Sequence, residues 1–237
     1  MRWSTRGKYL KIVMTACTLA GCGARSRPVA TAAKNSGEAL SPATPSVLLI
    51  GTSLTAGYGL DPHDAWATRI QEKVDSARLG FRVINAGVSG ESSADALHRI
   101  DWLLSQGAPA VVIVETGAND ALRGAPVDSI RTNLDSTLSR LDQRQPRPVI
   151  IVAGMEALPN LGRQYGEAFR GIFPAEARAH HDRYLPFLLD GVAGIPALNQ
   201  GDGIHPNATG SRRVAENVWQ LLEPILDSLH RMRHDSL

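Results

Sequence analysis

A serine, a histidine and an aspartate stand in short glycine-containing segments that flank expected elements of secondary structure. Ser53 lies in GTSLTAG, directly after the apolar run VLLIG, and Asp202 and His205 lie in GDGIHPN near the carboxyl end of the chain. A serine hydroxyl becomes an effective nucleophile when a base takes its proton. That base is usually histidine, and a carboxylate or carbonyl holds its ring in one tautomer. An aspartate three residues before a histidine, across a turn with glycine and proline, can reach the imidazole, so the pattern indicates a Ser–His–Asp arrangement.

Each of these residues also has an ordinary structural explanation. A serine between a strand and a helix is most often a cap or turn residue, and an aspartate before a helix is a common N-cap. Asn207 can serve as that N-cap instead, which leaves Asp202 free to bond His205. The loop of Ser53 is not a P-loop, because no Gly-Lys-Ser/Thr follows. It is not a G-x-S-x-G elbow either, because Thr55 occupies the second glycine position.

Two further positions are candidates to bind the negative charge that develops when a serine attacks a carbonyl group. Asn119 follows AVVIVETG, the strongest strand candidate, where an unbonded amide is costly. Its side chain is a possible oxyanion donor, with a turn asparagine as the alternative. Gly90 lies in NAGVSGESS, where no side chain blocks the approach of a substrate to its backbone N–H; a plain turn glycine is the alternative. Together these residues supply every part of a serine hydrolase.

The elements that must position these residues alternate between apolar runs and amphipathic segments. Such alternation predicts a parallel sheet with helices on both sides, and active sites of these sheets form at the carboxyl ends of the strands. The loops after the first three expected strands hold Ser53, Gly90 and Asn119. Strands are expected at 47–51, 81–86, 110–117, 148–154 and, more weakly, 184–189, and helices at 65–77, 93–105, 126–141, 165–181 and 206–229.

The first residues have the layout of an export signal. MRWSTRGKYLK is basic and lacks an acid, and IVMTACTLAG is apolar and too short to span a bilayer stably. The segment LAGC resembles a bacterial lipobox, in which Cys22 is lipidated and becomes the mature N-terminus; an ordinary signal peptide with a chance cysteine is the alternative. We therefore expect a signal peptide over residues 1–21, a lipidated cysteine with a flexible tether over 22–46, and one folded domain over 47–232.

This layout sets the expected location and charge. We expect an exported, membrane-anchored lipoprotein that faces the periplasm or the cell exterior, on the outer membrane if the cell has one, because Gly23 rather than aspartate follows the cysteine. Loss of the leader's four cations lowers Lys+Arg from 25 to 21 against 23 Asp+Glu, so the net charge changes from +2 to −2. This charge offers no electrostatic basis for binding nucleic acid. The other cysteine, Cys17, lies in the leader, so no disulfide framework is expected.

The ordered blocks resemble those of the SGNH, or GDSL-type, hydrolases. VLLIGTSLTAGYGL, VINAGVSGESS, VIVETGANDALRG and DGIHPN match the blocks of that family, over residues 47 to about 225. ALPNLGRQYGEAF (157–169) is similar to a segment of the bacterial periplasmic thioesterase, arylesterase and lysophospholipase subgroup. The resemblance implies an α/β fold, a three-layer α/β/α sandwich with a flavodoxin-like parallel sheet of about five strands. It also implies a serine esterase that hydrolyses acyl esters through an acyl-enzyme, with lysophospholipase or acyl-thioesterase activity.

The resemblance assigns a role to each matching residue. Ser53 is the nucleophile, His205 is the base and then the acid, and Asp202 orients His205. The backbone N–H groups of Ser53 and Gly90 and the side-chain amide of Asn119 bind the oxyanion. A loop that is mobile in the family follows Asn119, and an acyl groove lies beside it. The implied substrate contacts of these two regions are Asp120, Leu122, Leu158 and Pro159.

One position departs from the family pattern: the first block usually reads Gly-Asp-Ser-Leu, and Thr52 replaces its aspartate here. That aspartate is not the acid of the triad, so the chemistry can persist. Neither a cofactor nor a metal is expected, because the seven histidines are scattered and H-E-x-x-H is missing. Asp61 and Asp64 are interpreted as caps. We expect a monomer that takes a small acyl-ester or lipid substrate. Deacetylation of a polysaccharide and ligand binding without catalysis are the alternatives.

Overall fold

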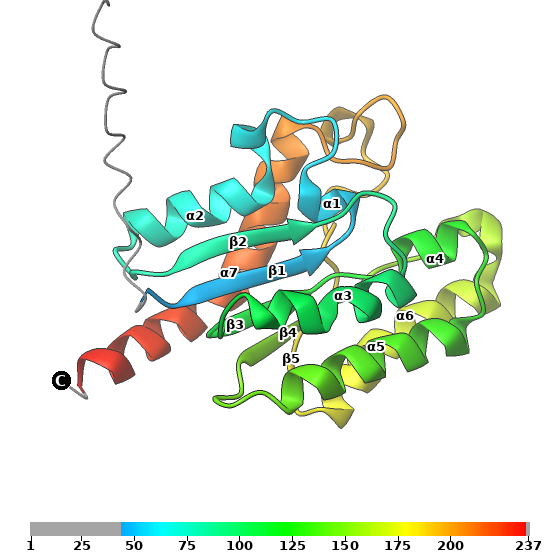
Figure 1. Ribbon diagram of the computed structural model, residues 1–237. Helices are drawn as coiled ribbons and strands as arrows, with labels where there is room; N and C mark the ends of the chain where they lie inside the picture. The colour runs from blue at the N-terminus through cyan, green and yellow to red at the C-terminus, as the bar shows by residue number, and fades with distance from the viewer. Residues whose placement is uncertain (1–43, 236–237) are drawn as a thin grey trace, which may run out of the picture. The chain divides into compact units, whose positions relative to one another are not determined.

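The computed structural model describes residues 44–235, in which a five-stranded parallel sheet forms the centre of the fold (Figure 1). The strand order β2-β1-β3-β4-β5 is the flavodoxin-like order of a doubly wound sheet, which confirms the expected fold class. The elements follow one another as β1 (Ser46–Gly51), α1 (Ser53–Ala56), η1 (Pro62–Asp64), α2 (Trp66–Ser76), β2 (Arg82–Gly87), α3 (Ser93–Ser105), β3 (Val111–Val114), α4 (Ala118–Leu122), α5 (Val127–Asp142), β4 (Val149–Ala153), η2 (Pro159–Leu161), α6 (Arg163–Ala179), β5 (Arg183–Leu185), η3 (Pro196–Leu198) and α7 (Ala208–His234).

The central strands are buried on both faces of the sheet. Every residue of β1 and β3 is buried, as expected for apolar runs without alternation in a parallel sheet. Val47–Ile50 of β1 pair in register with Val111–Val114 of β3. In contrast, β2 lies at an edge of the sheet, and none of its residues is fully buried. The nucleophile candidate therefore follows one of the most enclosed strands of the fold.

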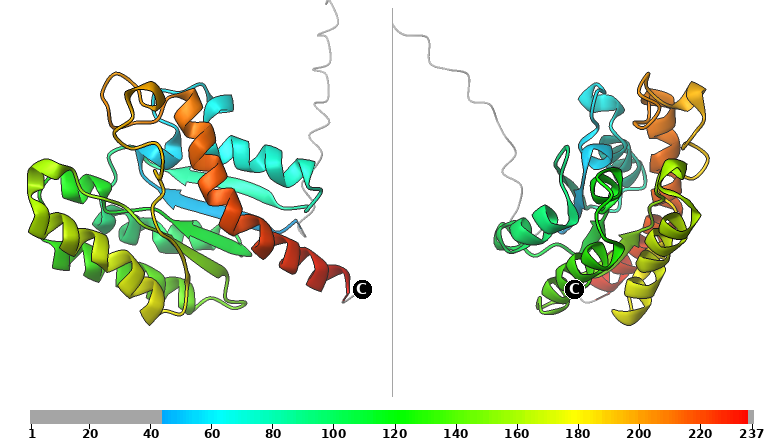
Figure 2. Two further views of the ribbon diagram at one scale, coloured as in Figure 1. Left: turned by 180° about the vertical axis from the view of Figure 1, so that it is seen from behind. Right: turned by 90° about the vertical axis from the view of Figure 1, so that its right-hand side faces the viewer.

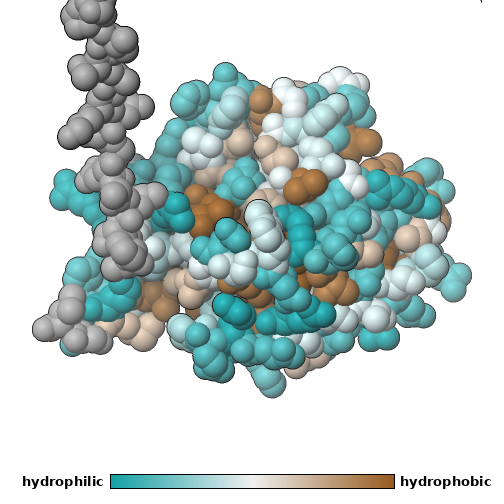
Figure 3. All heavy atoms as spheres, in the orientation of Figure 1, coloured by the Kyte–Doolittle hydropathy of each residue, from teal (hydrophilic) through white to brown (hydrophobic). Residues whose placement is uncertain are grey.

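Helices cover both faces of the sheet. α2 packs against α7, whereas α3 packs against α5 and α5 against α6. The view from behind in Figure 2 shows α7 crossing the sheet. This long helix buries Val214, Val218 and Leu222 along one stripe, as its amphipathic sequence predicts. Among the described residues, no helix combines the length and apolar character needed to cross a membrane. The face shown in Figure 3 is mainly hydrophilic, with separate apolar patches.

Most expected elements are present, and the differences lie at their ends. β3 stops at Val114, so the following ETG is not part of the strand. The weak last strand is only three residues long, and α7 runs on to His234, beyond the expected end at 229. Two short helices, α1 and α4, occupy segments that were expected to be loops. The expected leader and the residues of the tether up to 43 lie outside the described residues.

Candidate active site

The structure brings together the loops that follow β1, β2 and β3 and the loop that precedes α7. Ser53 is the first residue of α1, and Thr52 is the N-cap of that helix. Gly90 follows β2, Asn119 lies in α4 after β3, and His205 stands shortly before α7. Because the strands are parallel, the first three loops meet at the same edge of the sheet. The candidate residues therefore converge, although 152 positions of the sequence separate Ser53 from His205.

The serine, histidine and aspartate form one continuous chain of contacts. Ser53 Oγ lies 2.8 Å from His205 Nε2, and His205 Nδ1 lies 2.7 Å from Asp202 Oδ2. A carboxylate can only accept a hydrogen bond, so a neutral imidazole carries its proton on Nδ1 and presents the lone pair of Nε2 to the serine hydroxyl. This is the tautomer that can remove the serine proton.

Asp202 is held by three donors. Its Oδ2 accepts from the ring of His205, and its Oδ1 accepts from the backbone N–H groups of Ile204 at 2.9 Å and His205 at 3.0 Å. The ring of His205, followed by these two backbone donors, lowers the pKa of Asp202 from 3.8 to about 2. Gly203 makes the intervening turn with φ of 73°, in the left-handed region that favours glycine. The carboxylate therefore stays ionised at neutral pH.

Two residues that sequence reasoning missed support the loop of His205. The ring of Tyr58 lies against the imidazole, with centroids 4.8 Å apart. Gln200 donates from Nε2 to the backbone oxygens of Tyr58 at 2.7 Å and Pro206 at 3.0 Å, so it joins the histidine loop to the segment after α1. Asn207 caps α7 by accepting from two backbone N–H groups, as expected. No sequence pattern marks Gln200, because it lies 142 positions from Tyr58.

The three candidate oxyanion donors border one cavity. The backbone N–H of Ser53 stands at the start of a helix, where N–H groups lack an intrahelical partner. Gly90 has φ of 81°, and a Cβ at this position would meet no atom within 4 Å. The amide of Asn119 donates from Nδ2 to the backbone oxygen of Glu91 at 2.9 Å. One N–H of that amide is thereby engaged and the other remains for a ligand.

A buried carboxyl group beneath the serine loop was also missed. Glu115, directly after β3, accepts hydrogen bonds from Thr52 and Thr55, and its side chain is almost wholly buried. Burial raises the pKa of Glu115, while the N–H and hydroxyl of Thr52 act in the opposite direction. The available signal was a glutamate at the end of an unbroken apolar run, VVIVE, where a charged residue is costly.

The cavity beside Ser53 has a volume of about 540 Å³ and a largely apolar lining. Of the expected substrate contacts, Leu122, Leu158 and Pro159 line it. Four of the eight large apolar side chains that are exposed among the described residues also line it, namely Tyr58, Leu122, Leu158 and Ile204. Half of the large exposed apolar side chains among the described residues thus border the cavity that holds the candidate catalytic residues.

Asp120 does not lie where the resemblance implied. It is outside the lining of the cavity, and its side chain is buried. Its carboxylate accepts from the backbone N–H of Ser93 at 2.8 Å and from the hydroxyl of Ser93 at 2.7 Å. Asn133 donates to the same hydroxyl at 2.9 Å. These bonds join Asp120 of α4 to Ser93 at the start of α3.

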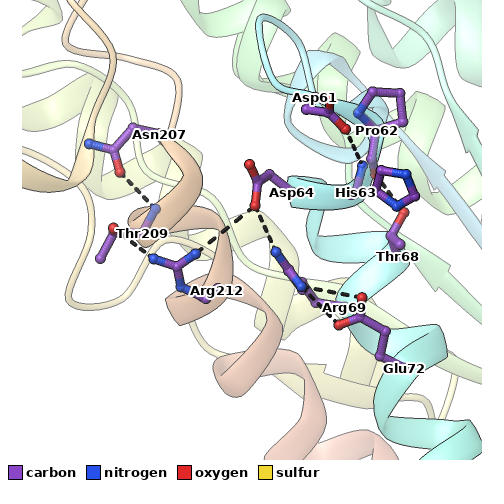
Figure 4. Close-up of polar contacts among 10 residues, drawn as sticks. All are labelled: Asp61, Pro62, His63, Asp64, Thr68, Arg69, Glu72, Asn207, Thr209 and Arg212. Atoms are coloured by element: carbon purple, nitrogen blue, oxygen red, sulfur yellow. Dashed lines mark hydrogen bonds and ion pairs between the residues drawn. The ribbon is translucent and has the colours of Figure 1, made fainter.

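A surface network connects the segment after α1 with the start of α7 (Figure 4). Asp64 Oδ1 lies 2.7 Å from Arg69 and 4.0 Å from Arg212 of α7. Asp61 caps η1 by accepting from His63 N, as expected, but Asp64 forms ion pairs instead of a cap. Asp64 and Arg69 are half-buried, and ion pairs near the surface contribute about 0–1 kcal/mol each, so the network adds little to stability.

One group of potential metal ligands lies away from this cavity. Asp135 of α5 and Glu176 and His180 at the end of α6 place their ligand atoms within 4.8 Å of one another. His180 is already bonded on both sides, by Asp142 at 2.6 Å and by Asp135 at 3.0 Å. Burial alone would lower the pKa of His180, but these two carboxylates raise it. An imidazolium between carboxylates explains the arrangement without a metal.

The sequence is similar to a described protein family and to several named proteins. The model described as the GDSL-like Lipase/Acylhydrolase family matches residues 49–213, which is more than half of the chain. Esterase TesA of Pseudomonas aeruginosa is 36% identical over 184 residues, covering 78% of this chain and 90% of that protein. Thioesterase 1/protease 1/lysophospholipase L1 of Escherichia coli is 34% identical over 194 residues, covering 82% of this chain and 88% of that protein.

The solved structures agree with this relationship. A crystal structure of TesA superimposes with a TM-score of 0.72 at 36% identity, covering 76% of this chain and 98% of the other. AlinE4, described as an SGNH-hydrolase family esterase, has a TM-score of 0.64 at 38% identity, covering 77% and 97%. The extent of the family match and the identity to these relatives show that the chain belongs to the GDSL-like lipase/acylhydrolase family and is a serine ester hydrolase of the SGNH type.

Proposed function

We propose that this protein hydrolyses acyl esters with Ser53 as the nucleophile, His205 as the general base and acid, and Asp202 as the residue that orients the base. The observation that carries the proposal is the unbroken contact from Ser53 Oγ through the imidazole to Asp202, at 2.8 Å and 2.7 Å. Such a chain supplies an activated hydroxyl at neutral pH.

In the first half-reaction, the Ser53 oxygen bonds the carbonyl carbon of the ester while His205 Nε2 takes the hydroxyl proton. The carbonyl oxygen becomes an oxyanion, which accepts from the backbone N–H groups of Ser53 and Gly90 and from the side chain of Asn119. Each such donor contributes roughly 3–4 kcal/mol of transition-state stabilisation. The imidazolium then gives its proton to the departing alcohol oxygen, the bond from carbon to that oxygen breaks, and an acyl-enzyme remains.

In the second half-reaction, a water molecule takes the place of the alcohol. His205 removes a proton from the water, whose oxygen bonds the acyl carbon, and the same three donors receive the oxyanion. Collapse of this intermediate breaks the bond to Ser53, and His205 returns the proton to the serine oxygen. The products are a carboxylic acid and the original enzyme. Asp202 stays ionised throughout and stabilises the imidazolium.

The substrate class we infer is an ester whose acyl group is apolar. A cavity of about 540 Å³ with a mainly apolar lining beside Ser53 supports this choice. Leu122, Leu158 and Pro159 would contact the acyl chain. The names of the relatives include esterase, thioesterase and lysophospholipase, so aryl esters, lysophospholipids and acyl thioesters are the compounds to test. No observation on the site favours an acetylated polysaccharide.

We also propose export and anchoring through a lipidated Cys22, with the catalytic domain over residues 47–232 as a monomer on a flexible tether. The support is the basic leader, the short apolar stretch and the segment LAGC. Radiolabelled palmitate fed to expressing cells should appear in the wild-type protein and not in Cys22→Ala. Label retained in Cys22→Ala would contradict the anchor. Light scattering of the purified domain tests the monomer.

The experiment that tests the catalytic proposal compares the purified domain with Ser53→Ala on four substrate classes. These are p-nitrophenyl esters of increasing acyl length, a lysophospholipid, an acyl thioester and acetylated sugars. We expect hydrolysis of the acyl substrates by the wild type and near-background rates for Ser53→Ala, because the parts of a triad act as a unit. Preference for acetylated sugars would favour the polysaccharide alternative, and full activity of Ser53→Ala would refute the proposal.

A further inference from the structure

We propose that Glu115 is a positioning residue of the catalytic serine: its buried carboxyl group binds the residues on both sides of Ser53 and so fixes the nucleophile and its backbone N–H relative to His205. This inference rests on the proposed function of Ser53. It concerns a residue that contacts neither the cavity nor the reacting atoms.

The carboxyl group joins two positions of the serine loop. Glu115 Oε2 accepts from the backbone N–H of Thr52 at 2.7 Å and from the hydroxyl of Thr55 at 2.9 Å. The hydroxyl of Thr52 lies 2.8 Å from Oε1 and 3.0 Å from Oε2. Thr52 immediately precedes Ser53 and Thr55 follows it by two residues, so the same side chain restrains the chain before and after the nucleophile.

Within the described part of the chain, the side chain of Glu115 has no partner of opposite charge. Glu115 is 1% exposed, and no ion pair involves it among residues 44–235. Burial raises the pKa of Glu115, and the negative charge of Glu91 adds to this effect. A carboxyl group buried in this way is costly unless hydrogen bonds compensate it. Among residues 44–235, the donors that compensate it all belong to the serine loop, so the carboxyl group and the loop conformation depend on each other.

The backbone of β1 is shaped to let this carboxyl group approach. A Cβ at Gly51 would lie 2.1 Å from Thr55 Oγ1 and 2.6 Å from Glu115 Oε2, which no real side chain tolerates. Glycine at this position therefore makes room for the contact between the strand end and Glu115. Gly51 thus leaves space for the carboxyl group of Glu115, and Thr52 and Thr55 donate hydrogen bonds to it.

Other side chains hold a different part of the loop. Asn85 donates to the backbone oxygen of Thr55 at 2.9 Å, and the indole of Trp66 donates to the backbone oxygen of Leu54 at 3.0 Å. These contacts fix carbonyl groups after the nucleophile. Glu115 is the side chain that binds Thr52, the residue whose conformation sets where Ser53 begins the helix.

The same geometry explains the role of threonine at position 52. Thr52 replaces the usual aspartate of the first family block, and its hydroxyl donates to Glu115. A second carboxylate at this distance would repel the first, unless one of the two carried a proton. Threonine thus gives Glu115 a neutral donor in a site without a cation.

Small displacements of a catalytic group strongly reduce the rate: a shift of about 1 Å can lower it about 100-fold. We therefore expect Glu115→Leu and Thr52→Val to lower kcat at least about tenfold, with KM within about threefold of wild type. Thr52→Ser keeps the hydroxyl, and Glu115→Gln keeps an acceptor for Thr52 N–H and Thr55. Both conservative variants should stay within about threefold of the wild-type kcat.

The assay measures kcat and KM for a short chromogenic ester per active site, titrated with a fluorophosphonate, together with Tm for each variant. Leu138→Ala, a fully buried change in α5, is the matched control because it lowers Tm without touching the serine loop. The inference predicts that Leu138→Ala keeps its kcat per titrated site while Thr52→Val loses it. If Glu115→Leu does not fold, the result for Thr52→Val tests the inference, because this substitution removes one hydroxyl and no charge.

Two results would overturn the inference in different ways. Thr52→Val and Glu115→Leu with wild-type kcat per titrated site and a lowered Tm would assign Glu115 to stability alone, and the triad would stand. A wild-type protein without hydrolysis that depends on Ser53 would overturn the proposed function and this inference with it. Loss of kcat in Thr52→Val with rescue in Thr52→Ser is the supporting result.

Discussion

Replacing Asp202 by asparagine keeps the size of the side chain and removes its charge, and the surrounding donors decide which way the new amide turns. Oδ1 accepts from two backbone N–H groups, of Ile204 at 2.9 Å and His205 at 3.0 Å. An amide nitrogen in that place would face two donors, so the amide oxygen stays there. The NH₂ group then faces Nδ1 of His205 and leaves the ring proton on Nε2. That tautomer cannot accept the proton of Ser53.

The size of the effect follows from this tautomer. The same substitution in a serine protease triad lowers kcat by about 10⁴, which corresponds to about 5 kcal/mol of transition-state stabilisation. The side chain of Asp202 is 38% exposed, so solvent can relieve part of the mismatch. We therefore expect Asp202→Asn to lose about 10³–10⁴ in kcat. Asp202→Ala leaves the ring free to change tautomer and should lose less.

The assay is kcat for a short chromogenic acyl ester per active site, with circular dichroism to show that both variants are folded. The order wild type, then Asp202→Ala, then Asp202→Asn supports the tautomer argument. Activity of Asp202→Asn within about tenfold of wild type would refute it. Equal losses for both variants would show that the charge of the carboxylate matters and the tautomer does not.

Three further outcomes are expected. Asn119→Ala should lower kcat about 10²–10³-fold with little change in KM. An unchanged kcat with a raised KM would contradict an oxyanion role. Gly90→Ala should cost about 1–2 kcal/mol of unfolding free energy, because its φ is positive while the added Cβ meets open space; urea denaturation with no loss would contradict this. The pKa of Asp202 is about 2 in the folded protein, below its ordinary 3.8, so its bonds stabilise the fold above about pH 4 and this stabilisation is lost towards pH 2. The difference in unfolding free energy between wild type and Asp202→Ala should therefore narrow as the pH falls, and a constant difference would contradict the low pKa.

The sheet and the convergence of the site could be predicted because local patterns carry that information. VLLIG and AVVIVE are continuous apolar runs, and amphipathic helices separate them, so a parallel sheet with active loops at one edge follows. Ser53 could be matched with His205 from chemistry alone, because a serine nucleophile needs a base and Asp202 stands three residues before His205, where it can orient the imidazole. The structure brings these residues within hydrogen-bonding distance of one another.

The rest of the site depends on tertiary contacts that leave no local pattern. Glu115 lies 63 positions from Thr52 and Gln200 lies 142 positions from Tyr58, so only the folded chain shows these pairs. Asp120 was assigned to the substrate because it follows Asn119, but in a short helix neighbouring side chains point in different directions. Its carboxylate accepts a hydrogen bond from Ser93 and does not line the cavity.

The most direct test of the account is covalent labelling with a fluorophosphonate followed by peptide mass spectrometry. The account predicts one adduct per chain, located on Ser53, with loss of ester hydrolysis in proportion to labelling. Ser53→Ala should take up no label, whereas Ser129→Ala, a surface serine on α5, should label and hydrolyse like the wild type. An adduct on another residue, or hydrolysis that persists in Ser53→Ala, would contradict the assignment of Ser53 as the nucleophile.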